Sequence, residues 1–163
     1  MSNFNFGAKS EKELSSCNSD LQMIMKEAIK ISPIDFGIVY GRRPAELQFE
    51  LFKKGRELQS GVWIIVNKKF VVTNLDGYQK KSMHNYEPSK AVDIRIYVPG
   101  HPELAYDPEH LCYVAGIIMT VADQLFKERW ISHRIRWGGN WDQDGIILFD
   151  QSLADRPHFE IIE

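Results

Sequence analysis

The sequence has few cysteines, little net charge and no long apolar run. Its two cysteines, Cys17 and Cys112, form no Cys-x-x-Cys pair. We therefore expect no disulfide framework and interpret both as buried or unreactive thiols. The 20 basic and 22 acidic residues leave a net charge of −2, which does not favour nucleic-acid binding. Because no candidate membrane span or secretion signal is present, we expect no membrane insertion and a chain that first resides in a cytoplasm.

Length and composition predict one globular domain over residues 1–163. Of these residues, 44% are hydrophobic, which is enough for a substantial apolar core. The first residues, to about position 18, are polar, and we expect them to be loosely ordered.

Three stretches have the apolar spacing of helices. The first covers about 19–30 and can be capped by Ser19. The second begins at Pro44, a favoured first position, with Leu47 and Leu51 directed inward. The longest helix is expected to open at Asp107-Pro108-Glu109 and to bury Leu111, Val114, Ala115, Ile118 and Leu125.

Alternating apolar residues predict several strands between these helices. One covers 36–40, and another covers 92–98 with two unlike faces. The runs 62–66 and 70–73 flank Asn67-Lys68-Lys69 and are interpreted as a hairpin. Two late strands are expected at 135–137 and 157–162. Mixed helices and strands in this order predict an α+β domain.

Two histidines and an aspartate have the residue types that bind an open catalytic zinc. The pleat of strand 92–98 places Asp93 opposite its apolar neighbours, and the same alternation places His158 opposite Phe159. His84 precedes the first of these strands. Adjacent strands would bring all three side chains to one point, although each alone is most simply an exposed polar residue.

Several motifs that surround these residues follow one another along the chain. They are Tyr40-Gly41-Arg42-Arg43-Pro44-x-Glu46-x-Gln48, Val72-Thr73-Asn74, Ser82-Met83-His84-Asn85-Tyr86, Ala91-Val92-Asp93-Ile94, Arg136-Trp137-Gly138-Gly139-Asn140-Trp141-Asp142 and Asp155-x-x-His158-Phe159-Glu160. Together they resemble the D-alanyl-D-alanine carboxypeptidase family of zinc peptidases. That family includes the vancomycin-resistance D,D-dipeptidases and the phage L-alanyl-D-glutamate endolysins, and it shares a fold with the hedgehog signalling domain.

The resemblance runs from about Phe36 to the C-terminus and implies a small antiparallel sheet flanked by helices. It departs from the family pattern at one place, where the segment between His84 and Asp93 is longer than usual. Because loop entropy grows slowly with length, we expect a variant loop that still delivers His84.

The resemblance also implies roles for individual residues. His84, Asp93 and His158 would bind Zn²⁺. Asp155 would be the general base that takes a proton from water and passes it to the leaving amine. Arg43 would stabilise the polarised carbonyl or the oxyanion.

Three further residues are expected to support these groups or to bind substrate. Ser82 would orient a ligand or bind the substrate backbone. Glu160 shares a strand face with His158 and is either a rival base or a supporting residue. Trp137, like Trp141, either lines the cleft or belongs to the core.

The expected function is a zinc metallopeptidase that cleaves peptidoglycan stem peptides. The closing motif favours a phage endolysin, an endopeptidase at the L-alanyl-D-glutamate bond. We expect it to be monomeric and to stay in the host cytoplasm until a separate pore-forming protein releases it. One alternative is a D-alanyl-D-alanine carboxypeptidase or dipeptidase, for which Arg95 is the candidate carboxylate clamp. Another is a non-catalytic, zinc-stabilised cell-wall-binding or virion module, which would need neither Asp155 nor Arg43.

Overall fold

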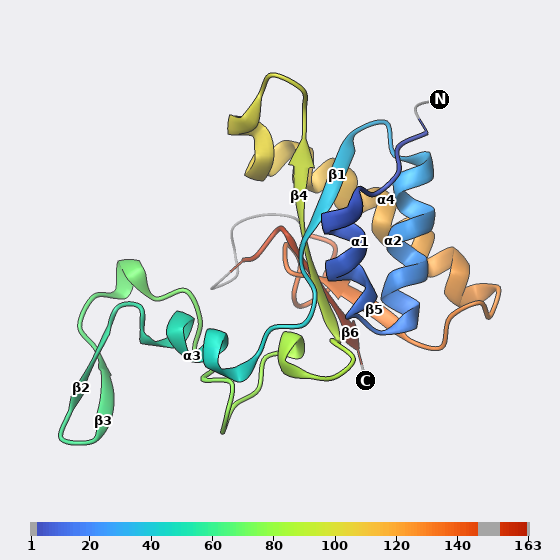
Figure 1. The fold of residues 1–163 in the computed structure, drawn as a ribbon. Coiled ribbons are helices and arrows are strands. Elements are labelled where there is room, and N and C mark those ends of the chain that lie inside the picture. Colours follow the sequence, from blue (N-terminus) through green and yellow to red (C-terminus); the bar gives the residue numbers. More distant parts are fainter. Residues whose placement is uncertain (1–2, 147–153, 163) are drawn as a thin grey trace.

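The computed structural model describes residues 3–146 and 154–162 and contains helices packed on a small sheet (Figure 1). The α-helices are α1 (Ala8–Ser15), α2 (Ser19–Ile31), α3 (Ala45–Lys53) and α4 (Pro108–Lys127). The strands are β1 (Asp35–Tyr40), β2 (Arg56–Gln59), β3 (Val62–Ile65), β4 (Ala91–Tyr97), β5 (Arg134–Trp137) and β6 (His158–Ile162). The 3-10 helices are η1 (Lys68–Phe70), η2 (Met83–Asn85) and η3 (Pro102–Tyr106).

The main sheet has four strands in the order β1-β4-β6-β5, and each neighbouring pair is antiparallel. Helices α1, α2 and α4 gather on one side of this sheet in Figure 1. The α+β class and the small antiparallel sheet flanked by helices are therefore confirmed. Within the described ranges, no helix combines the length and apolarity that a membrane crossing requires.

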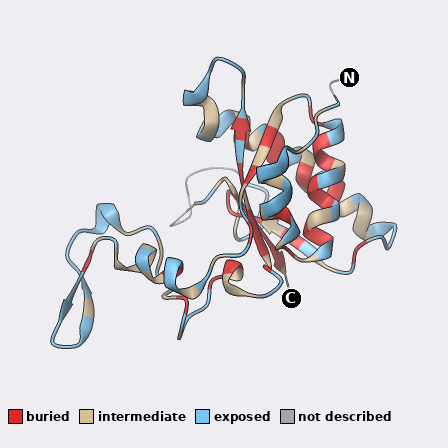
Figure 2. Ribbon diagram, in the orientation of Figure 1, coloured by how far each residue is buried: buried red, intermediate tan, exposed pale blue. Residues whose placement is uncertain are grey.

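The core lies between the sheet and these helices, where the buried ribbon is concentrated in Figure 2. On β4, Val92 and Ile94 are fully buried, and on β6 Phe159 is fully buried. Since successive side chains point to opposite faces of a strand, Asp93 and His158 are directed to the other face. The expected two-faced pattern of both strands is confirmed.

The N-terminal segment differs from its expected loose order. Residues 8–15 form α1, and Leu14 and Cys17 are buried in the core. Ser89 accepts a backbone hydrogen bond from Asn18 and donates one to Ser16. The polar composition of this segment reflects the exposed side of α1, whereas a few apolar residues fix it to the domain.

The region after β1 also differs in detail from the expectation. Helix α3 begins at Ala45, with Leu47 exposed and Leu51 only half-buried. Gln48 is the buried residue of this helix, because its amide group has polar partners in the site described below.

The expected hairpin of 62–66 and 70–73 is wrong. Instead, β3 forms an antiparallel hairpin with the preceding strand β2, through a turn at Ser60 and Gly61, which both have positive φ. Residues 56–59 pair with residues 62–65, and residues 68–70 form η1. The alternation of 56–59 is too polar to predict a strand, and glycine at the turn is its clearest signal.

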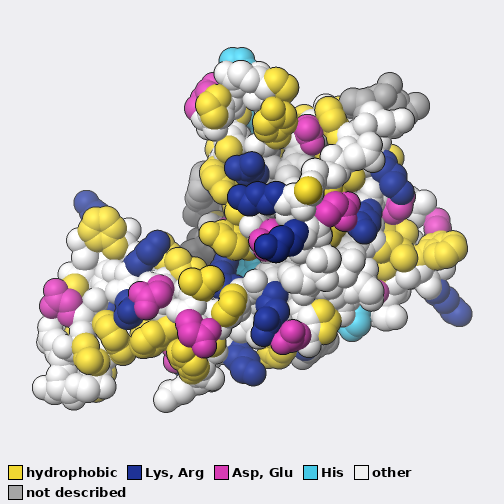
Figure 3. All heavy atoms as spheres, in the orientation of Figure 1, with side chains coloured by type: hydrophobic (Ala, Val, Ile, Leu, Met, Phe, Trp, Pro, Cys, Tyr) yellow, Lys and Arg dark blue, Asp and Glu magenta, His cyan; other side chains and the backbone are white. Residues whose placement is uncertain are grey.

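Helix α3 and the β2–β3 hairpin, residues 45–81 with their connections, form an arm that projects from the sheet (Figure 1). Its own small cluster is aromatic: Phe49 packs edge-on against Trp63 and Tyr78. Hydrophobic side chains lie on its surface among basic and acidic ones in Figure 3. The arm forms one wall of the pocket described next.

Candidate active site

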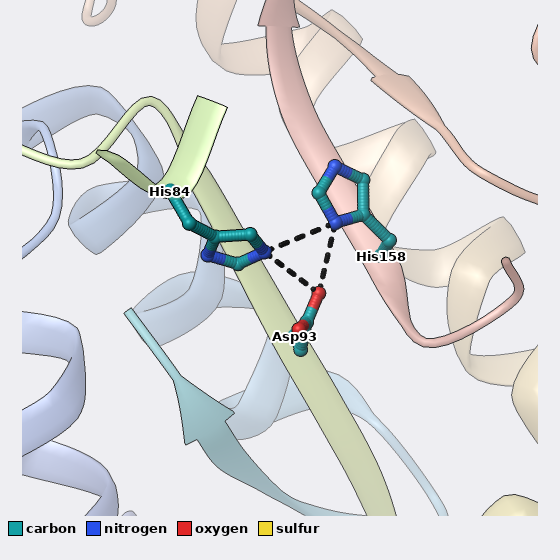
Figure 4. A group of neighbouring side chains, drawn as sticks. All are labelled: His84, Asp93 and His158. Atoms are coloured by element: carbon teal, nitrogen blue, oxygen red, sulfur yellow. Dashed lines mark hydrogen bonds and ion pairs between the residues drawn. The ribbon is translucent and has the colours of Figure 1, made fainter. Parts of the chain in front are cut away.

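His84, Asp93 and His158 meet at one point on the face of the sheet opposite the core (Figure 4). Asp93 and His158 are directly paired across β4 and β6, and His84 comes from η2. The Asp93 Oδ1 atom lies 3.1 Å from His84 Nε2 and 2.9 Å from His158 Nδ1. The two ring nitrogens are 3.2 Å apart.

These three atoms are arranged as a group that can hold a metal ion. Ligand atoms at roughly 2.0–2.1 Å from a tetrahedral zinc lie about 3.3 Å from one another, close to the separations seen here. The convergence anticipated from the strand pattern is therefore present in the fold, and the longer loop does deliver His84.

The outer nitrogen of each histidine has an acceptor that fixes the ring. His84 Nδ1 donates to the Gly41 carbonyl oxygen at 2.7 Å. His158 Nε2 donates to Glu160 Oε2 at 2.9 Å. Because each outer nitrogen carries a hydrogen, His84 Nε2 and His158 Nδ1 are the nitrogens that can offer a lone pair at the common point once they are deprotonated. Partners of this kind set the tautomer and orientation of metal-binding histidines.

The electrostatics keep Asp93 ionised. Burial alone would raise the pKa of Asp93, but the charge of His84 and the hydrogen bonds from both histidines lower it below its usual range. Burial opposes protonation of His158, yet its bonds to Asp93 and Glu160 raise the pKa of His158 to about 9. The site therefore favours positive charge at the centre of the group, as a cation-binding site does.

The short helix η2 holds His84 in place. Ser82 Oγ accepts from the His84 amide, and Asn85 Oδ1 accepts from the Ser82 amide, which together form a capping box. Asn85 also donates to the Arg43 carbonyl, and the Arg43 amide donates to the His84 carbonyl. Ser82 thus fixes the backbone of the turn that carries His84, and its expected role toward a ligand or substrate stays a prediction.

Arg43 lies beside the group from the other side. Its Nη2 contacts Asp93 Oδ2 at 3.3 Å, and its Nη1 donates to Gln48 Oε1 at 2.9 Å. The Gln48 amide nitrogen donates to the Leu75 carbonyl. Gln48 was not assigned a role from the sequence, although it closes the motif that contains Arg43. Through these two hydrogen bonds, the buried Gln48 of α3 holds the Arg43 guanidinium in place.

Glu160 is fully committed to its partners. It accepts from His158 and, through Oε1, from Arg136 Nε at 2.8 Å. Burial alone would raise the pKa of Glu160, but these two hydrogen bonds lower it. The carboxylate therefore stays ionised and paired, which suits a residue that supports His158.

The two tryptophans of the closing motif have different positions. Trp137, expected either in the cleft or in the core, lies in the core with its Nε1 donating to the Arg156 carbonyl. Trp141 lines the pocket, 5.4 Å from the His158 ring and below the Arg136 guanidinium. Strand β5 ends at Trp137, so its side chain follows the alternation of the sheet, whereas Trp141 lies on the following turn.

Asp155 lies on the turn that leads into β6. Its backbone donates to Gly138 and accepts from the His158 amide. A Cβ at Gly138 would lie 2.2 Å from the Asp155 carbonyl oxygen, so the Gly-Gly turn is required for this close approach. Burial of the carboxyl group and the negative charge of Asp93 raise the pKa of Asp155, against the positive charges nearby. Of the two candidate bases, Asp155 is the one whose pKa moves towards neutrality.

A pocket of about 680 Å³ surrounds these groups. The sheet and η2 form its inner wall, and α3 with residues 72–75 forms its outer wall. Arg95 is exposed on β4 and does not line it, so the candidate clamp from the sequence lies outside the site.

The comparisons with known proteins agree with this geometry. A family model described as phage L-alanyl-D-glutamate peptidase matches residues 1–162. The chain belongs to this family. The crystal structure of Serratia marcescens L-Ala D-Glu endopeptidase ChiX is similar to the peptidase, with a TM-score of 0.65 and 20% identity, over 98% of this chain and 91% of that one. No curated protein matches the present chain significantly.

Family membership makes this chain a peptidase that cleaves peptidoglycan. The likeness to the solved structure supports the fold, including the sheet that brings the ligand-type residues together. The expected family, the fold class and the expected peptidoglycan peptidase activity are therefore confirmed.

Proposed function

We propose that this peptidase is a zinc enzyme that hydrolyses the L-alanyl-D-glutamate bond of peptidoglycan stem peptides. The observation that carries the proposal is the convergence of His84 Nε2, Asp93 Oδ1 and His158 Nδ1, with an acceptor beside the outer nitrogen of each ring. Two histidines and one carboxylate form a ligand set of catalytic zinc. When bound there, zinc would polarise the scissile carbonyl and lower the pKa of a water molecule towards ~7.

Asp155 is proposed as the general base. It lines the pocket, and its pKa is raised from the ordinary value towards neutral pH. A base of this kind accepts the proton of the attacking water and returns it to the leaving amine. Glu160 is less suited to this role because His158 and Arg136 already occupy its oxygens.

Arg43 is proposed to stabilise the negative charge that develops on the carbonyl oxygen. Its guanidinium is oriented by Gln48 and is largely buried beside Asp93. A fixed cation in a site that excludes water stabilises the transition state without needing to reorganise. A purely structural metal would need neither this arginine nor Asp155, so these groups favour catalysis over a non-catalytic module.

The proposed biological setting is that of a phage endolysin. Family membership supports it. We propose that the enzyme acts as a monomer and remains in the host cytoplasm until a separate protein opens the way to the wall. The exposed position of Arg95, outside the pocket, removes the candidate clamp for a carboxypeptidase.

Mass spectrometry of digested stem peptides tests the bond. The expected products are a glycan fragment that ends in L-alanine and a peptide that begins with D-glutamate. Release of D-alanine alone, with the L-alanyl bond intact, would show a carboxypeptidase instead.

A further inference from the structure

The pocket contains two lysines that the proposed chemistry does not use. Lys54 follows the last residue of α3, and Lys81 immediately precedes the cap of η2; both line the pocket and are exposed. Within the part of the chain that the structure describes, no carboxylate pairs with either ammonium group. The arginines of the pocket differ, because Arg43 pairs with Asp93 and Arg136 with Glu160.

Both lysines directly adjoin elements that position residues of the proposed active site. Lys81 adjoins Ser82, the cap of the turn that carries His84. Its ammonium group lies 5.8 Å from the centre of the Tyr86 ring. Lys54 ends the helix whose Gln48 orients Arg43. Their backbone positions are therefore fixed relative to the metal-ligand group, while their side chains stay free to contact a ligand.

The charge balance of the pocket leaves a role for these cations. Asp93 and Glu160 line the same pocket, but each is already paired with an arginine, so these opposite charges largely offset one another. The two lysines, one after α3 and one before η2, pair with no carboxylate of the described residues and therefore provide a place for an anion. Because Arg43 and Arg136 already bind carboxylates of the protein, the lysines are the cationic groups available to a substrate anion.

The proposed substrate carries a negatively charged group next to the bond that is cut. In a stem peptide, D-glutamate is joined to the following residue through its side-chain carboxyl group. Its α-carboxylate is therefore free and is attached to the carbon that bears the scissile nitrogen. A carboxylate of this kind forms charge-assisted hydrogen bonds with lysine.

We propose that Lys54 and Lys81 form a carboxylate subsite that binds the free α-carboxylate of D-glutamate on the leaving-group side of the scissile bond. This inference rests on the proposed function and adds a determinant of substrate choice to it. It predicts that the enzyme distinguishes a free α-carboxylate from an α-carboxamide at that position.

The test compares two synthetic stem peptides that differ only in this group. The wild-type enzyme should cleave the carboxylate peptide with a kcat/KM roughly 10-fold or more above that for the carboxamide, the size expected for one bond to a charged group. Lys54→Gln and Lys81→Gln should each reduce this preference, and the double variant should abolish it. Cleavage of the carboxamide peptide should stay within about 2-fold of wild type, because an uncharged group gains little from a nearby cation.

The chain offers matched controls, since each lysine has a lysine neighbour that does not line the pocket. Lys53→Gln and Lys80→Gln make the same change in net charge and should keep the preference. Equal cleavage of both peptides by the wild type, or an unchanged preference in the double variant, would overturn the subsite and leave the bond specificity standing. Failure of the wild type to cut either peptide at the L-alanyl bond would overturn both proposals.

Discussion

The Nδ1 atom of His84 donates to the carbonyl oxygen of Gly41 at 2.7 Å. Gly41 lies tightly against the N-terminal segment. Its amide donates to Glu13 Oε2 at 3.2 Å, and an added Cβ would lie 2.2 Å from the Glu13 carbonyl oxygen and 2.3 Å from Ser16 Oγ. Burial raises the pKa of the neighbouring Cys17 thiol to about 12, so that thiol is unreactive. The N-terminal segment therefore supports the candidate metal ligand His84 without contributing a side chain to the group.

Gly41→Ala should destabilise the fold and weaken metal binding together. The added methyl group displaces α1 or the Gly41 carbonyl, and overpacking of this kind costs about 1–3 kcal/mol. Gly116→Ala is the matched control, because Gly116 lies in α4 with no atom within 4 Å of an added Cβ. That change should stabilise the fold by about 0.5–1 kcal/mol. Urea unfolding and metal titration of both variants test this, and tight metal binding by Gly41→Ala would contradict the supporting role.

Removal of the metal should abolish hydrolysis. We expect one zinc per chain by elemental analysis and loss of activity with a strong chelator. His158→Ala should lose both metal and activity because one of three ligands is missing. His101→Ala changes an exposed histidine that pairs with Glu103 and should keep both. Full activity in a metal-free preparation would refute the zinc mechanism.

Asp155→Ala and Glu160→Ala should have different effects. Asp155→Ala keeps the three metal ligands but removes the base, so kcat should fall by ~10²–10⁴-fold with zinc content unchanged. Glu160→Ala removes the acceptor of His158 Nε2 and should mainly weaken zinc binding, by about 10–100-fold. Steady-state kinetics and zinc affinity separate the two effects. An inactive Glu160→Ala beside an active Asp155→Ala would reverse the assignment.

The pH dependence of stability should contain a contribution from Asp20. Burial alone would raise the pKa of Asp20, but hydrogen bonds from the His133 side chain and from the Ser132 and His133 amides lower it. Since the folded-state pKa is lowered, this stabilisation is fully present above the ordinary value of 3.8 and is lost as pH falls through the folded-state value.

Asp20→Ala should therefore cost about 1–3 kcal/mol at neutral pH and progressively less in acid. Urea unfolding of metal-free wild type and variant between pH 7 and pH 3 measures the difference. Glu27→Ala, which removes an exposed pair with Lys30, is the control and should cost less than about 1 kcal/mol. A difference for Asp20→Ala that does not shrink in acid would contradict this account.

Much of the sheet and most of the metal-ligand group were predictable from local patterns. Strict alternation along β4 separated Asp93 from Val92, and the same rule separated His158 from Phe159. The proline and aspartate at the start of α4 marked its cap, and Asp107 does accept from the amides of Glu109 and His110. These features depend on neighbours in sequence.

The features that were missed depend on contacts distant in sequence. The Gly41 carbonyl carries no side-chain signal, yet it orients His84. Gln48 resembles any polar helix residue until its partners from residues 73–75 are in place. Helix α1 looked polar because only Leu14 within it is buried. The hairpin was misplaced because the polar strand β2 has no apolar alternation to reveal it.

The position of β6 between β4 and β5 has a consequence for folding. Asp93 and His158 are 65 positions apart in the chain, and contacts between distant segments close slowly. Without β6, β4 pairs only with β1, and β5 has no partner in the described sheet. Insertion of β6 is therefore expected late in folding, and it completes the sheet and supplies His158 in one event. A partly folded chain lacks one of the three candidate ligands, so a metal bound by all three would stabilise only the finished fold.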